Sequence, residues 1–166
     1  MLQKTLSRTN KFNWRRFLWL HVKGFAVAFL VVVVCGIWPA VVVTPSINKT
    51  FFLITKHYKK FPHGSYVYFK KNRPSEDINY PIIKKVVGVS GDVITIKNNN
   101  CYVNKQLIGP IQGKTRKGAV LQAIKPGVIS QGKLFVAGNI KDSFDSRYQE
   151  FGLLDKSEVV RAHAIF

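Results

Sequence analysis

An uncharged run from Phe25 to Val43 constrains the fold of this 166-residue chain more than any other feature. Coiled as an α-helix, its 19 residues would extend about 28 Å, close to the hydrocarbon thickness of a bilayer, about 30 Å. We therefore expect one transmembrane helix over residues 24–43. It would separate a basic N-terminus, residues 1–23, from an outer domain, residues 44–166.

The charged residues before this run predict its orientation. All of them are basic: Lys4, Arg8, Lys11, Arg15, Arg16 and Lys23. Because lysine and arginine beside a membrane helix favour the cytoplasmic side, we expect a cytoplasmic N-terminus in a bacterial inner membrane and a periplasmic outer domain. A cleaved signal peptide is the alternative. The run is longer than the apolar core of a leader, about 7 to 15 residues, and no small-x-small cleavage signal follows it.

The outer domain, about 120 residues, is long enough for one compact domain. Its sequence is mainly β, because short β-branched and aromatic runs alternate with Gly, Pro and Asn. The expected strands are Thr50–His57, Ser65–Lys71, Ile82–Val89, Val93–Lys97, Tyr102–Leu107, Lys133–Ala137 and Glu158–Phe166. Turns are expected at 62–64, 90–92 and 98–100, and the stretch 113–132 is expected to be largely loop.

Composition argues against several classes of function. The net charge is +18, but no run of five like charges and no nucleic-acid motif accompanies it, so we expect no nucleic-acid partner. The four histidines lack ligand spacing, so neither a metal site nor another cofactor is expected. Cys35, in the apolar run, and Cys101, in the outer domain, are not expected to pair. Gly109–Thr115 resembles a phosphate-binding loop but is one residue too short between its glycines.

Three segments carry residues with catalytic potential: Thr44-Pro45-Ser46, Ile82–Asp92 and Ala137–Tyr148. A serine hydroxyl is a weak nucleophile until a base takes its proton, and lysine is the available base where no histidine stands in motif context. Lys84 lies in an apolar strand, where burial would lower the pKa of its amine from the reference of about 10.4. Lys85 is expected on the solvated face.

With these segments the chain resembles the type I signal peptidases, membrane-anchored serine endopeptidases with a serine/lysine dyad on a mostly β, partly barrel-like fold. The family pattern Lys-Arg-Val-Val-Gly-x-x-Gly-Asp is matched from Lys84 to Asp92, with Lys85 in place of arginine. The pattern Asp-Ser-Arg-Tyr is matched in full at 145–148. The usual Gly-Asp-Asn before that turn reads Ala137-Gly138-Asn139 instead.

The resemblance implies the catalytic roles. It makes Ser46 the nucleophile and Lys84 its general base, with Thr44 helping to bind the oxyanion. Ser46 would attack the scissile carbonyl and form an acyl-enzyme, and Lys84 would then protonate the leaving amine.

It also implies supporting residues. Ser143 falls on the serine that orients the lysine amine, while Asp145 and Arg147 fall on a supporting ion pair.

The segment Thr44–Phe52 resembles the conjugative-transfer (TraF-type) branch, whose pattern is Thr-x-Ser-Leu-Pro-x-Gly-Leu-Tyr. That branch processes pilin precursors, and some members join the new end to the other terminus of the pilin. The partners implied are membrane lipid and precursor proteins or pilin with small residues near the cut. Ile47, Phe51 and Phe52 are expected to line the substrate groove, although ordinary core positions explain them equally well. Nothing in the sequence predicts the oligomeric state.

Other readings stay open. One is a general secretory signal peptidase, which has the same chemistry. Another is a non-catalytic subunit of a transfer or pilus assembly. A Ser-His-Asp hydrolase using His163 is disfavoured, because His163 lies in a plain terminal strand and no Gly-x-Ser-x-Gly elbow exists. A dyad requires the Ser46 hydroxyl and the Lys84 amine within about 3 Å of each other, and a structural subunit does not.

Overall fold

The computed structural model describes residues 13–41, 47–70, 81–115 and 118–165. The chain divides into two compact units, Met1–Cys35 and Gly36–Phe166, each described here by itself. The first holds the helix α1, Trp14–Cys35, and the second holds the strands. The predicted fold class, mainly β with one N-terminal helix, is confirmed.

The helix α1 begins and ends at local signals in the sequence. Asn13 caps its start, since the Asn13 side chain accepts a hydrogen bond from the Arg16 N–H at 3.2 Å. Its 22 residues extend about 33 Å, and none of them is buried. By length and composition α1 can cross a membrane.

The expected helix over residues 24–43 is corrected by the structure. The chain is helical only to Cys35, and the strand β1, Ile37–Val41, follows. Gly36 adopts a left-handed conformation (φ 61°), which ends the helix. Pro39 has no N–H and would clash with the carbonyl of Cys35, four residues earlier, if the helix continued.

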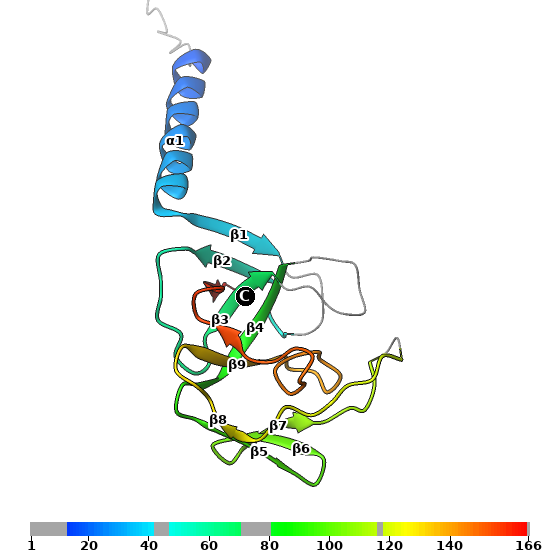
Figure 1. Ribbon diagram of the computed structural model, residues 1–166. Coiled ribbons are helices and arrows are strands. Elements are labelled where there is room, and N and C mark those ends of the chain that lie inside the picture. The colour runs from blue at the N-terminus through cyan, green and yellow to red at the C-terminus, as the bar shows by residue number, and fades with distance from the viewer. Residues whose placement is uncertain (1–12, 42–46, 71–80, 116–117, 166) are drawn as a thin grey trace, which may run out of the picture. The chain divides into compact units, whose positions relative to one another are not determined.

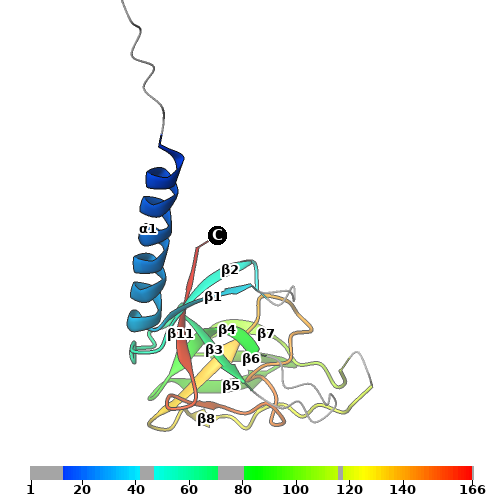
Figure 2. The same ribbon diagram turned by 90° about the horizontal axis from the view of Figure 1, so that it is seen from above.

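Among the described residues, seven strands form a large antiparallel sheet in the order β1-β2-β11-β3-β4-β9-β10 (Figure 1). The further strands are β2 Phe51–Thr55, β3 Tyr66–Lys70, β4 Pro81–Val89, β9 Lys133–Ala137, β10 Leu154–Asp155 and β11 Val160–Ala164. β11, red in Figure 2, returns the end of the chain between β2 and β3. Hydrophobic clusters cover both faces. Val67 and Val86 belong to one cluster, and Phe52 and Ile83 belong to the other.

A smaller sheet, in the order β7-β6-β5-β8, lies at the end of the domain far from β1 and β2 (Figure 1). Its strands are β5 Val93–Lys97, β6 Asn100–Val103, β7 Gln106–Pro110 and β8 Gly127–Val128. The expected single strand Tyr102–Leu107 is wrong, because a tight turn at Asn104 and Lys105, both with positive φ, divides it. β1, β8 and β10 were not predicted.

The two sheets pack closely where β4 carries Gly88. A Cβ at Gly88 would lie 2.7 Å from the Ile129 side chain, 3.0 Å from Phe135 and 3.1 Å from Val103. Glycine at this position of the Lys-Lys-Val-Val-Gly segment therefore lets the small sheet approach β4. The ladder between β4 and β9 is irregular at the same place, between Val86 and Gly88.

Candidate active site

Lys84 projects from the middle of β4 into the protein interior. It is directly opposite Val67 of β3 and shares a sheet face with Val86, and its side chain is only 1% exposed. Its Nζ donates a hydrogen bond to the Ser143 Oγ at 2.7 Å. Lys85, on the other face, is partly exposed. The structure thus distinguishes the two lysines of the pair.

The burial of Lys84 matters chemically. Removing an amine from water favours its neutral form, and only a neutral amine can accept a proton. A hydroxyl such as that of Ser143 offers an oxygen acceptor without a full negative charge, so it can orient the amine without holding it protonated as a carboxylate would.

Ser143 is held in place by Arg147. The Arg147 Nη2 donates to the Ser143 carbonyl oxygen at 2.9 Å and to Asp145 Oδ2 at 3.0 Å. The Arg147 Nε donates to Asp145 Oδ1 at 2.8 Å. Asp145 and Arg147 are both fully buried, so this bidentate pair is shielded from water. The structure therefore brings Lys84, Ser143, Asp145 and Arg147 into one connected network.

Other N–H groups of the Arg147 guanidinium donate hydrogen bonds to backbone carbonyls. Arg147 Nη1 donates to Pro110 at 2.9 Å and to Lys141 at 3.0 Å. Burial alone would lower the pKa of Arg147, but the Asp145 carboxylate more than offsets it and the net direction is upward. A Cβ at Gly109 would lie 2.8 Å from Nη1. Gly109 and Pro110, on β7, thus connect the small sheet to the site.

Sequence reasoning missed the roles of Ser146 and Tyr148. The Ser146 Oγ accepts a hydrogen bond from the Val136 N–H at 3.1 Å and donates to the Gly152 carbonyl at 2.8 Å, which fastens the turn to β9. The Tyr148 hydroxyl accepts the Gln112 N–H at 3.1 Å. Both lie inside the matched Asp-Ser-Arg-Tyr pattern, which was the available signal.

Thr44 and Ser46 lie outside the described residues. Ile47, which is bonded to Ser46, is buried in the same hydrophobic cluster as Ile83, which is bonded to Lys84. Phe52 is buried in this cluster too. Phe51 is exposed, so of the three residues predicted for a groove it alone offers surface to a partner in the described structure. Their role in binding stays a prediction.

Within the described residues, neither His163 nor His63 forms a hydrolase triad. The His163 Nε2 is hydrogen-bonded to the Thr55 hydroxyl at 3.2 Å. His63 lies 2.6 Å from Asp92 Oδ2, but Asp92 also accepts the Val89 N–H at 2.7 Å and closes the turn between β4 and β5.

The pKa of Asp92 reflects these contacts. Burial acts to raise it, but hydrogen bonds from the Val89 N–H, Asn104 and His63 outweigh burial and hold the pKa below its usual value. Asp92 is thus a structural carboxylate of the turn.

Other candidate chemistry is weak within the described segments. They contain no group of three His, Cys, Asp or Glu residues that could hold a metal. Burial raises the pKa of the Cys101 thiol to about 12, which makes it a poor nucleophile.

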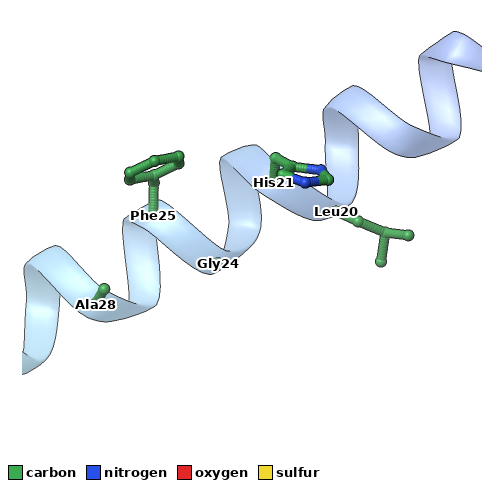
Figure 3. A pocket seen from close by; sticks show the side chains of 5 residues that line it. All are labelled: Leu20, His21, Gly24, Phe25 and Ala28. Carbon is green, nitrogen blue, oxygen red and sulfur yellow. The ribbon is translucent and has the colours of Figure 1, made fainter.

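The hollow in Figure 3 lies on α1 alone. It is lined by Leu20, His21, Gly24, Phe25 and Ala28. Gly24 leaves the gap, since a Cβ there would meet nothing within 4 Å apart from its chain neighbours and the backbone of the helix itself. All of these residues come from one helix, and His21 has no second polar side chain beside it in the lining.

Comparison with known proteins gives one clear result. The family model described as signal peptidase, peptidase S26, matches residues 15–166. A search of curated protein sequences gave no significant match. The matched range includes Ser46 and the whole Lys84 network.

Proposed function

Because the chain belongs to the signal peptidase family S26, we propose that it is a membrane-anchored serine endopeptidase acting through a dyad of Ser46 and Lys84. The carrying observation is the buried Lys84 amine, hydrogen-bonded to Ser143 at 2.7 Å. An amine kept from water and oriented by a neutral hydroxyl has the properties of a general base. Thr44 is proposed to help bind the oxyanion.

In the proposed reaction the Lys84 amine takes the proton of the Ser46 hydroxyl as its oxygen attacks the scissile carbonyl. The tetrahedral oxyanion is held by the Ser46 N–H and the Thr44 hydroxyl. Collapse breaks the peptide C–N bond, and Lys84 gives its proton to the leaving amine. Water, deprotonated by Lys84, then hydrolyses the ester and restores Ser46.

Packing near the two residues supports this pairing. Ile47, bonded to Ser46, and Ile83, bonded to Lys84, belong to one buried cluster, which brings the two chain segments near each other on the face of β4 opposite the Lys84 side chain. Arg147 and Asp145 fix the Ser143 backbone, which limits the positions that the Lys84 amine can take. A non-catalytic subunit would not need a buried lysine, whose desolvation is costly.

The segment Thr44–Phe52 favours pilin precursors as substrates, in conjugative transfer, over the general secretory role. In a transfer peptidase of the cyclising kind, a substrate amine would replace water in the second step and leave a peptide bond between the pilin ends. Intact-mass analysis of processed pilin separates the two outcomes, because the linear pilin released by hydrolysis is heavier than the cyclic pilin by one water.

We propose that α1 is the anchor, with the N-terminus in the cytoplasm of a bacterial inner membrane and the domain in the periplasm. Lys23 lies within α1, and its Nζ is 5.4 Å from the Trp19 ring, one turn nearer the helix start. The amine is thus directed toward the N-terminal membrane surface, where a charge is tolerated. Protease added outside spheroplasts should digest the domain and spare the first residues; the reverse pattern would refute this topology.

Processing assays on purified full-length variants test the dyad. Ser46→Ala and Lys84→Ala should each abolish cleavage of a precursor, because each removes half of one catalytic unit. Lys85→Ala is the matched control, since it removes a neighbouring amine from the opposite face of β4 and should retain most activity. Circular dichroism confirms folding of each variant. Near-normal cleavage by Ser46→Ala or Lys84→Ala would refute the dyad.

A further inference from the structure

The loop after β2, residues 56–60, lies against the first residue of the second unit. The Lys56 N–H donates to the Gly36 carbonyl at 3.4 Å. A side chain at Gly36 would meet the His57 Nε2 at 3.2 Å and the Lys56 Cβ at 3.8 Å. Gly36 directly follows Cys35, the last residue of α1. This inference rests on α1 crossing a bilayer. In that case the bond between Cys35 and Gly36 keeps this loop near the point where the helix leaves the bilayer.

The loop is strongly basic. It carries three exposed lysines, Lys56, Lys59 and Lys60. Arg161 of β11, which is partly exposed, lies beside the loop. The Arg161 Nη1 donates to the Lys60 carbonyl at 2.8 Å, and its guanidinium lies 5.2 Å from the Tyr58 ring. Ion pairs found among the described residues involve none of these four cations. We call Lys56, Lys59, Lys60 and Arg161 the basic cluster.

Aromatic side chains accompany the basic cluster. Trp38 is 48% exposed and Tyr58 is 44% exposed. The Lys56 Nζ lies 5.7 Å from the Trp38 ring. Tryptophan and tyrosine are enriched at the surface of a bilayer, where the ring enters the headgroup layer. A lysine beside such a ring is then held at the depth of the lipid phosphates.

We propose that the basic cluster binds the anionic headgroups of phospholipids at the outer surface of the membrane that α1 crosses. A cation near an anionic surface contributes about 1 kcal/mol, or about fivefold in affinity. That attraction is lost beyond about 10 Å, the screening length of salt. The contact of the loop with Gly36 keeps the cations within reach. Lipid binding there would fix the orientation of the domain on the membrane.

The test uses the full chain with Trp14→Phe and Trp19→Phe, which leaves Trp38 as the only tryptophan. The protein is placed in nanodiscs of phosphatidylcholine, or of phosphatidylcholine with a third replaced by phosphatidylglycerol, and both carry a lipid with a quencher on its headgroup. We expect stronger quenching of Trp38 with phosphatidylglycerol at low salt, and loss of this gain at high salt.

Charge variants show whether the basic cluster is responsible. Lys56→Gln, Lys59→Gln and Lys60→Gln together should abolish the gain from phosphatidylglycerol. The matched control removes the same charge from exposed positions on and beside the small sheet. It combines Lys97→Gln, Lys105→Gln and Lys114→Gln, and it should leave the gain intact.

The outcomes separate the inference from the proposed function. A chain that does not comigrate with the discs refutes the anchor and the lipid site together. Comigration without any effect of phosphatidylglycerol on Trp38 refutes the lipid site alone. An equal loss of the gain in both charge variants also overturns it, since total charge rather than the basic cluster would then be responsible. None of these results depends on peptidase activity.

Discussion

Replacing Asp145 with asparagine tests how the buried network stabilises the site. The Asp145 carboxylate accepts four hydrogen bonds: from Arg147 Nε at 2.8 Å, Arg147 Nη2 at 3.0 Å, the Arg147 N–H at 3.2 Å and the Gly138 N–H at 2.9 Å. Asparagine keeps the shape, but it turns an NH₂ group toward at least one of these donors and leaves the guanidinium without its counter-charge.

The expected cost follows from burial. Removing one partner of a buried ion pair destabilises a protein by about 3 to 5 kcal/mol, because the other charge stays desolvated. Lys133 and Asp155 form an internal control at a similar distance, 2.7 Å, with side chains 37% and 41% exposed. Asp155→Asn should cost no more than about 1 kcal/mol, since water and salt screen that pair.

Urea unfolding of the full chain in detergent, monitored by near-ultraviolet circular dichroism, measures the free energy of unfolding of each variant. The two variants lose the same carboxylate charge, so the difference between them reports burial. Asp145→Asn should also lower the processing rate of those molecules that remain folded, because Arg147 would no longer fix Ser143. Equal and small losses of stability in both variants would refute the argument.

Three further outcomes are expected. Thr44→Val should reduce turnover by about 100-fold to 1,000-fold in a precursor-cleavage assay, the usual cost of one oxyanion donor; an unchanged rate would remove Thr44 from that role. The depressed pKa of Asp92 means that its contribution to stability is complete above about pH 4 and is lost as pH falls through the folded pKa. The stability gap between the unmodified chain and Asp92→Asn, from urea titrations, should therefore shrink toward pH 3, and a constant gap would contradict this. Gly109→Ala should cost about 1 to 3 kcal/mol by displacing Arg147, whereas Gly113→Ala, with nothing within 4 Å of its Cβ, should change stability by less than about 0.5 kcal/mol in the same titrations.

The local parts of the fold could be predicted from the sequence. β5 and β9 have the predicted bounds, because each is a short β-branched or aromatic run between turn residues. The burial of Lys84, with Lys85 on the other face, follows from strand alternation among apolar neighbours. The extent of α1 was misjudged, since hydropathy does not register that Gly36 and Pro39 end a helix. Hydropathy likewise did not indicate the hairpin turn at Asn104 and Lys105, which separates β6 from β7.

The long-range parts could not be predicted. Arg147 is held by the carbonyl of Pro110, 37 residues away, through a contact that exists only after the two sheets pack. No sequence pattern indicates that position 109 requires glycine. The requirement arises because the Arg147 guanidinium lies beside it. The burial of Ile47 and Phe52 in one cluster with Ile54, Ile83 and Ala162 also depends on packing between distant segments, and their apolar character alone did not indicate it.

The most direct test of the proposed mechanism is to capture the acyl-enzyme. The full chain is mixed with excess precursor, quenched in acid before the first turnover is complete, digested, and examined by mass spectrometry. The account predicts that the peptide containing Ser46 carries the N-terminal fragment of the precursor as an ester, and that Lys84→Ala forms no such adduct. An adduct on another residue, or cleavage that persists in Ser46→Ala, would contradict it.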